Sequence, residues 1–256
     1  MKNFSRTVQL HYSRLIFRSS LFLVALILYV YNRIKNTSHT FSGFEDNAVF
    51  LFVIWAFFLM EIVLRFFPFS LESMGCQKQF KKNYIPTPRA EEFSPPSTFK
   101  STLAVLVSWV ALNSIFGLLN FFGILDDGIM VLIALLFSVC DIICILFFCP
   151  FQTWFMKNKC CGSCRIYNWD YMMMCTPLLF VENIFAQTLF LASLILLARW
   201  EITHLLHPER FCELTNASLS CVSCKEKLCH NKKQLRSFLK KRKFNLIGNT
   251  AFKNKK

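Results

Sequence analysis

The sequence has none of the short motifs that identify the common enzyme classes. It contains no glycine-rich nucleotide loop, no hydrolase elbow, no metalloprotease helix and no paired-histidine ligand motif. Its apolar stretches also lack the alternation of polar and apolar residues that outer-membrane β-strands show. These absences disfavour those enzyme classes and a β-barrel, so the long apolar runs decide the fold class.

The composition indicates a membrane protein, with a mean hydropathy of +0.41 and 30 Phe among 256 residues. A helix needs roughly 20 residues to cross about 30 Å of hydrocarbon. Five apolar stretches approach or reach this length, near 15–31, 48–67, 102–123, 128–149 and 177–199. We therefore expect an all-α, multi-pass helical membrane bundle over residues 1–200. A cysteine-rich and then basic tail follows over residues 201–256.

The first and last stretches leave the number of spans open. Arg14 and Arg18 interrupt the first stretch, which begins like a signal peptide but has no small-x-small cleavage site after Tyr31. We interpret it as an uncleaved span. The last stretch has a polar stripe that suits either a bundle-facing surface or a helix lying in the interface. The sequence favours five spans, with four as the alternative.

Basic residues near span ends orient such proteins, because Lys and Arg resist translocation. With five spans and a cytoplasmic N-terminus in the plasma membrane, the first outer loop holds only Arg33 and Lys35 as basic residues. The basic residues 200–256 would then lie outside the cell. Either this tail is exoplasmic, or one apolar stretch is interfacial and the tail lies inside.

The tail also predicts a lipid partner. The chain has a formal net charge of +14, and beyond residue 224 it has twelve Lys and Arg residues but a single acid, Glu226. Beside a membrane bundle, each basic residue near the surface contributes about 1 kcal/mol of attraction to anionic lipid headgroups. We expect the bilayer and its anionic headgroups as partners, and we do not expect nucleic acid.

Four ionisable residues fall inside the apolar stretches: Glu61, Arg65, Asp141 and Glu182. Each costs about 2.5 to 3.5 kcal/mol on insertion scales, so such side chains usually face partners or water. The hairpin arrangement predicts that all four lie in the same half of the bilayer. They form either a structural network that includes Arg18 and fixes helix register, or an inner-half site for a cation, a proton or a headgroup.

Three local patterns bear on this cluster. Glu61 and Arg65 are four residues apart in the order that favours a helical ion pair. In the third stretch, Asn113, Gly117 and Asn120 share one face and predict a close helix-packing seam. Residues 165–171 suit the aromatic headgroup belt, and the alternative is a re-entrant segment that brings Asn168 and Asp170 to the polar cluster.

The twelve cysteines form two groups of interest outside the spans. One group, after the fourth stretch, is a C-x2-C pair, Cys161 and Cys164. The other group, in the tail, comprises Cys212, Cys221, Cys224 and Cys229. Such spacing can hold zinc or an iron–sulfur cluster, and an exoplasmic tail would instead favour disulfides. In that case Asn36 and Asn216 would be potential glycosylation acceptors.

The sequence supports three functional hypotheses. The first is a small transport or metal- and redox-handling membrane protein that uses the acidic cluster and a cysteine-based metal site. The second is a non-catalytic scaffold or assembly protein whose tail is ordered by disulfides or zinc. The third is a membrane-embedded enzyme that acts on a lipid or a thiol. The sequence does not favour an enzyme over the other two.

Overall fold

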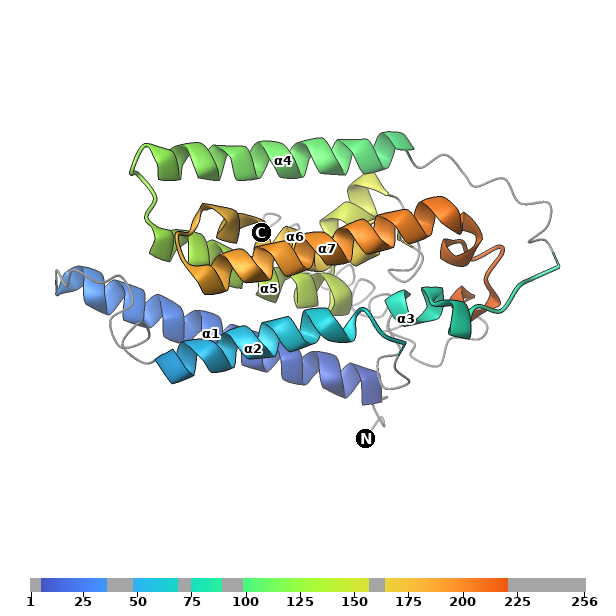
Figure 1. The fold of residues 1–256 in the computed structure, drawn as a ribbon, viewed down its shortest axis with the longest axis horizontal. Helices are drawn as coiled ribbons and strands as arrows, with labels where there is room; N and C mark the ends of the chain where they lie inside the picture. The colour runs from blue at the N-terminus through green and yellow to red at the C-terminus, as the bar shows by residue number, and fades with distance from the viewer. Residues whose placement is uncertain (1–5, 36–47, 69–74, 89–98, 157–163, 221–256) are drawn as a thin grey trace, which may run out of the picture.

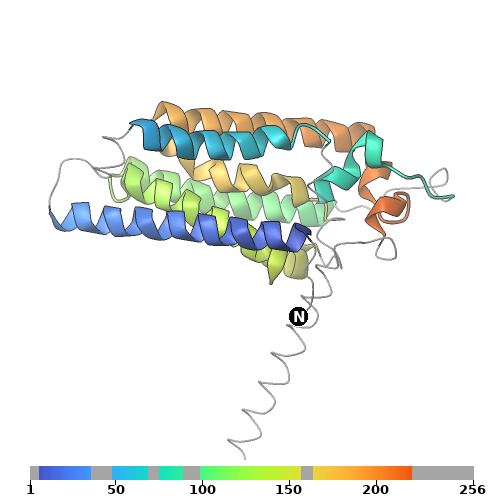
Figure 2. The same cartoon turned by 90° about the horizontal axis from the view of Figure 1, so that it is seen from below.

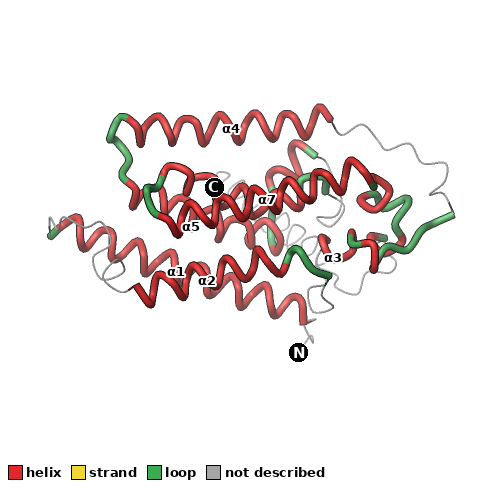
Figure 3. Tube along the Cα trace, viewed as in Figure 1, coloured by secondary structure: helices red, strands yellow, loops and turns green. Residues whose placement is uncertain are grey.

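The computed structural model describes residues 6–35, 48–68, 75–88, 99–156 and 164–220 (Figure 1). This part of the chain is helical and contains no strand, as Figure 3 shows. The five longest helices lie along one common axis (Figures 1 and 2). They are α1 (Arg6–Ile34), α2 (Ala48–Leu64), α4 (Phe99–Phe121), α5 (Asp127–Leu146) and α7 (Ile184–Leu206). The prediction of an all-α bundle is confirmed.

Four of these helices, α1, α4, α5 and α7, are long and apolar enough to cross a membrane. The second predicted stretch forms α2, which has only 17 residues and is about 26 Å long. Helix α2 ends early because Arg65 and Phe66 donate their backbone N–H groups three residues back, to Ile62 and Val63, and so tighten the chain into a turn. The structure therefore has four full-length candidate spans and one shorter apolar helix.

The fifth predicted stretch begins in the wrong place. Residues 164–183 form a broken segment of short helices, η3 (Tyr167–Trp169), α6 (Asp170–Cys175) and η4 (Thr176–Phe180). Pro177 has no N–H group to continue a regular helix. Helix α7 starts only at Ile184, where the Asn183 side chain accepts a hydrogen bond from the Phe185 N–H and caps the new helix. The hydropathy of residues 177–199 predicted one continuous helix, whereas the backbone forms the end of the broken segment and then a separate helix, α7.

The broken segment runs along the bundle from one end to the other. Near its start, Asp170 accepts a hydrogen bond of 2.8 Å from Arg65, just past the end of α2. Near its end, the Glu182 N–H donates to Asp127 at the first residue of α5, at 3.2 Å. Between these points it packs against both α5 and α7. The chain therefore passes along the bundle once more than the five predicted stretches provide.

This extra traverse places residues 207–220 beside the connection between α2 and α4. The Asn216 side chain donates to the Lys78 carbonyl at 3.0 Å, and the Ala217 N–H donates to the Ile85 carbonyl at 2.9 Å. We call this the basic end of the bundle, and it includes α3 (Gly75–Gln79), residues 80–88 and residues 207–220. The five-span prediction put the start of the tail on the face opposite this connection, whereas the structure places residues 207–220 at the same end of the bundle.

The other end of the bundle holds the turn at residues 122–127 and residues 181–184, and we call it the acidic end. Among the described Lys and Arg residues, Arg33 and Lys35 are the ones in segments attached to it. Asp126, Asp127 and Glu182 lie there, and Asp126 caps α5 by accepting a hydrogen bond from the Ile129 N–H. The two ends therefore differ sharply in charge.

Asn216 cannot serve as a glycosylation acceptor in this fold. The side chain is fully buried, and both of its amide hydrogens are used, on the carbonyls of Lys78 and Arg210. Its oxygen accepts from the Ser218 N–H. A glycan on the side-chain nitrogen would break this arrangement, and Asn36 lies outside the described residues.

Helix α4 lies along one side of the bundle (Figure 1) and packs through the seam that its sequence predicted. Asn113 and Gly117 are buried. Gly117 lies against the ring of Phe180 in the broken segment, where a Cβ atom would collide with the ring. The polar bond across the seam comes from Trp109, whose indole N–H donates to Thr176 at 3.2 Å.

We expect both chain termini to lie on the same face of the membrane. Tags fused to the two ends should be digested together when sealed vesicles are treated with protease from that face. A tag inserted between α1 and α2 should be protected under the same conditions. Digestion of the two terminal tags from opposite faces would contradict the extra traverse.

We expect Gly117→Ala to destabilise the bundle through its contact with Phe180. Alanine gains about 1 kcal/mol of helix propensity, and overpacking costs about 1 to 3 kcal/mol. The net effect in wild type should be a lower unfolding temperature in detergent. In a Phe180→Leu background, where the ring is gone, the same substitution should raise that temperature. The same sign in both backgrounds would refute the steric explanation.

Candidate functional site

Charged side chains from α1 and α2 meet inside the bundle. Arg14 and Arg18 are one helical turn apart on α1 and share a face. The Arg14 Nε lies 3.0 Å from Glu61 Oε1, and the Arg18 Nη2 lies 2.6 Å from Glu61 Oε2. The side chains of Arg18 and Glu61 are 2% and 3% exposed. One buried carboxylate on α2 therefore holds two guanidinium groups from α1.

Arg18 also reaches α5. Its Nη1 donates to the Ser138 carbonyl at 3.0 Å and lies 3.4 Å from the Asp141 carboxylate. The guanidinium carbon lies 5.7 Å from the centre of the Phe58 ring, within range of a cation–π interaction. Arg18 therefore links α1, α2 and α5 at a single buried point.

Arg65 makes a second ion pair with the broken segment. Its Nη2 donates to Asp170 at 2.8 Å, and its Nη1 contacts the Cys76 sulfur at 3.1 Å. The guanidinium lies over Tyr171, with its carbon 5.2 Å from the ring centre. Tyr171 in turn donates its hydroxyl to Glu61 at 3.3 Å. The tyrosine thus joins the two ion-paired groups into one network.

The charges of this network balance. Its three arginines face three carboxylates within the same half of the bundle. We use the name ion-pair network for Arg14, Arg18, Glu61, Arg65, Asp141, Asp170 and Tyr171. Burying an unpaired charge in a membrane is costly in free energy. Pairing each charged member of the network removes the largest part of that cost.

The structure brings three of the four predicted residues together and separates the fourth. It brings Glu61, Arg65 and Asp141 together, with Arg18 as the shared partner. The predicted helical pair does not form, because Glu61 bonds to α1 and Arg65 bonds to Asp170. Glu182 lies at the acidic end beside Asp127, so its predicted place in the same half is wrong. The broken segment carries the chain away between residues 170 and 182.

Sequence reasoning missed two of the network's members as partners. Arg14 was taken only as an interruption of the first stretch, although its spacing from Arg18 places both on one helical face. Tyr171 was assigned to the headgroup belt. The re-entrant alternative correctly brought Asp170 to the cluster. Asn168 lies beside the cluster and bonds to Gln79 at 2.7 Å.

The cysteine predictions remain largely untested by the fold. Cys161, Cys221, Cys224 and Cys229 lie outside the described residues. Cys164 is buried and Cys212 is half-buried, and both belong to segments at the basic end. Within the described ranges, no group of three metal-ligating side chains gathers. Zinc and iron–sulfur binding stay predictions.

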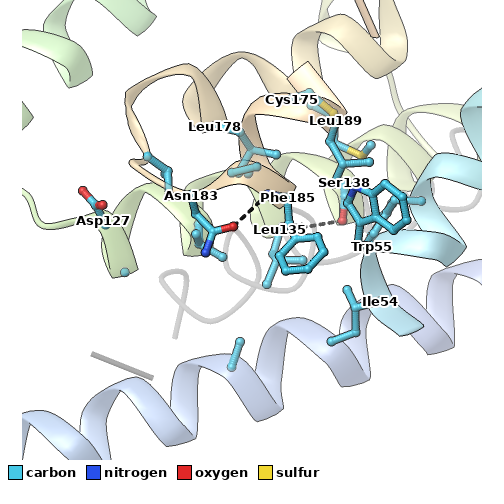
Figure 4. A pocket seen from close by; sticks show the side chains of 18 of the residues that line it. Ile54, Trp55, Asp127, Leu135, Ser138, Cys175, Leu178, Asn183, Phe185 and Leu189 are labelled. Carbon is cyan, nitrogen blue, oxygen red and sulfur yellow. Dashed lines mark hydrogen bonds between the residues drawn. The ribbon is translucent and has the colours of Figure 1, made fainter. Parts of the chain in front are cut away.

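An apolar cavity of about 270 Å³ lies between α1, α2, α5, the broken segment and α7. Figure 4 shows Asp127 at one limit of the cavity, with Ser138 and Trp55 towards the other. Asp127 and Glu182 form an exposed rim at the acidic end. Ser138 is the residue whose carbonyl binds Arg18. The cavity therefore extends from the acidic end of the bundle to the level of the ion-pair network.

Helix α6 connects the cavity to the network within six residues. Asp170 and Tyr171 are network members at its start. Met174 and Cys175 line the cavity at its end. Because these residues share one short helix, a shift of α6 alters both regions at once.

Arg18→Gln should destabilise the protein strongly, because it leaves Glu61 and Asp141 without their shared partner. Breaking a buried ion pair by removing one member typically costs about 3 to 5 kcal/mol. The matched control is Arg33→Gln at the acidic end, where the side chain is 76% exposed. Unfolding temperatures in mild detergent, followed by tryptophan fluorescence, measure the difference.

Adding Asp141→Asn to Arg18→Gln should recover part of the loss, because it removes one of the unpaired charges. Equal stability of Arg18→Gln and Arg33→Gln would show that the network does not hold the helices together.

Comparison with protein-family models, with curated proteins and with solved structures finds no match to this chain. What the site can do is therefore inferred from the residues of this chain alone. They present two distinct features, a charge-balanced network that holds the helices and an apolar cavity above it.

Proposed function

We propose that this protein transports a small amphipathic organic molecule across a membrane, with the apolar cavity as its binding site. The observation that carries the proposal is the position of the cavity. It has a rim at the acidic end, and the ion-pair network lies at its floor, between it and the basic end. A site reached from one face and closed towards the other is the arrangement that alternating access requires.

The broken segment supports the same proposal. Irregular backbone at membrane depth is tolerated where it is buried in protein or lines a cavity. In secondary transporters, substrate sites near the middle of the bilayer are typically formed by discontinuous helices. Here Met174, Cys175, Leu178 and Val181 of the broken segment all line the cavity.

In this proposal the ion-pair network closes the pathway towards the basic end. It does not bind the transported molecule. Each carboxylate of the network is already paired with an arginine, so none of them needs a separate cation to neutralise its charge. Movement of α6 would break Arg65–Asp170 and the Tyr171–Glu61 bond together. The step that opens the basic end is thus the step that separates these pairs.

We assign the basic end to the cytoplasm. Five helices and the broken segment give six traverses, which place both termini on one face. The positive-inside rule then agrees with every connection, including the tail whose charge conflicted with five spans. Attraction of the tail to anionic headgroups and residence in the plasma membrane stay predictions on this assignment.

A non-transporting scaffold is the second candidate, and the charge balance of the network favours it. A network that only fixes helix register also needs every charge paired. The two candidates differ over the cavity, because a scaffold has no use for it. Filling the cavity therefore separates them.

We expect Ala186→Phe, which places a ring in the cavity, to abolish transport. The assay is counterflow of radiolabelled phenyltrimethylammonium or benzenesulfonate into liposomes that contain the full chain and the unlabelled compound. At least one compound should enter faster than into protein-free liposomes. Ala186→Phe should slow this entry by about tenfold or more, the equivalent of about 1.4 kcal/mol.

The matched control is Ala111→Phe, which adds the same ring to an exposed position on α4. It should leave entry unchanged. Ala134→Leu, a smaller addition to the same cavity, provides a second variant if Ala186→Phe does not fold. Entry that equals the protein-free rate for both compounds, or that falls equally in Ala111→Phe, would refute transport through this cavity.

A further inference from the structure

We propose that the cavity selects an organic cation, a quaternary or protonated amine on a compact apolar body. The inference rests on the proposed function and specifies its substrate class. It follows from three properties of the cavity: its size, the charge of its rim and the aromatic rings in its wall.

The size and lining suit an apolar body. An apolar cavity of about 150 Å³ accommodates a benzene molecule, so about 270 Å³ leaves room for a larger group, on the order of ten heavy atoms. The wall is almost entirely aliphatic or aromatic. The polar groups deep in the wall are already engaged, since the Ser138 hydroxyl donates to Leu135 and the Trp55 indole donates to Thr188.

The rim is negative. Asp127 and Glu182 are exposed there, and the residues that line the cavity include no Lys, Arg or His. Arg33, a basic residue at this end, is paired at 3.9 Å with Asp126, and neither residue lines the cavity. A ligand entering from the acidic end therefore meets two carboxylates before any cation.

The helix dipoles at the rim reduce this charge without reversing it. Helices α5 and α7 both begin there, and each N-terminus carries roughly +0.5 of an elementary charge. The two carboxylates together carry two full negative charges, so the rim keeps a net charge of about −1. Acids at helix starts are common for structural reasons, and here the aromatic wall adds the second, independent observation.

That wall contains rings suited to a cation. Trp55 and Phe185 meet edge to face, with their centres 5.8 Å apart, and both line the cavity. Phe58 already faces Arg18, whereas Trp55 and Phe185 have no cationic neighbour among the described residues. Rings that surround an apolar site are the usual means of binding quaternary ammonium groups.

The floor of the cavity does not oppose a cation either. Arg18 approaches Ser138 from below, but Glu61 and Asp141 neutralise its charge. An anionic ligand would gain no free positive partner there, and it would have to pass the two rim carboxylates. The charges around the cavity thus favour a cation over an anion of the same shape.

The test uses three matched compounds: phenyltrimethylammonium, its neutral isostere tert-butylbenzene, and benzenesulfonate. Each competes with N-ethylmaleimide for access to Cys175, which lines the cavity. Mass spectrometry of the peptide that contains Cys175 gives the alkylation rate in the full chain. We expect phenyltrimethylammonium to protect Cys175 at a concentration about fivefold lower than tert-butylbenzene, and benzenesulfonate to protect least.

Combining Asp127→Asn with Glu182→Gln should remove this preference and leave protection by tert-butylbenzene unchanged. The control is Glu213→Gln, which removes one negative charge near the basic end and should leave the preference unchanged. If the double variant does not fold, the order of the three compounds in wild type decides alone.

The outcomes separate the two proposals. Equal protection by the cation and the neutral isostere, or a preference that survives the double variant, overturns the cation inference and leaves the proposed function standing. Absence of protection by any of the three, with no effect of Ala186→Phe on the alkylation rate, overturns the cavity as a binding site and both proposals with it.

Discussion

The ion pairs of Arg18 are the contacts on which the rest of the bundle depends. A lone arginine in the hydrocarbon core is costly, so a helix that carries one is stable only where acids from its neighbours meet it. Glu61 and Asp141 meet this requirement from α2 and α5. Because hydrophobic burial does not drive association between helices in lipid, such directional contacts fix which helices are neighbours and in what register. Arg18 therefore fixes the position of α1 together with Arg14, which binds the same carboxylate of Glu61.

The broken segment meets the same constraint in a different way. Its backbone departs from a regular helix around Pro177 and Val181, and such backbone cannot face lipid. It therefore lies between α5 and α7, where Asp170 is paired with Arg65 and Thr176 accepts from Trp109. Polar contacts at several levels hold a segment that hydropathy alone would not insert. This burial in protein is also what allows it to line a cavity.

Particular residues show how far the sequence alone could go. The long apolar runs predicted the helices because length and composition suffice for a span, and the spacing of Asn113 and Gly117 predicted the seam of α4. The sequence could predict that Asp141 and Arg65 belong to a group of charged residues, but not which residue each one pairs with. Pairing depends on distances between helices that are far apart in sequence. Glu182 was misplaced because hydropathy does not distinguish a broken segment from the start of the helix that follows it.

The same segment explains why the charge of the tail conflicted with five spans. The positive-inside rule counts traverses, and a traverse that is interrupted by proline and buried among other helices gives no separate peak of hydropathy. This conflict pointed to a missing traverse, because an odd number of spans puts the basic tail on the face opposite the basic loops. In the proposed topology, one added traverse between Asp170 and Glu182 removes the conflict.

The link between network and cavity sets an energetic condition on the proposed transport. To shift a protein from about 1% to about 99% in one of two conformations, a ligand must bind that conformation more tightly by about 5.5 kcal/mol. A ligand in the cavity touches Met174 and Cys175 but not the network, so its binding energy can reach the ion pairs only through α6. Asp170 and Tyr171 stand one turn before those cavity residues on the same short helix. The coupling therefore depends on α6 moving as a rigid unit, which its short length and its contacts with α5 and α7 favour.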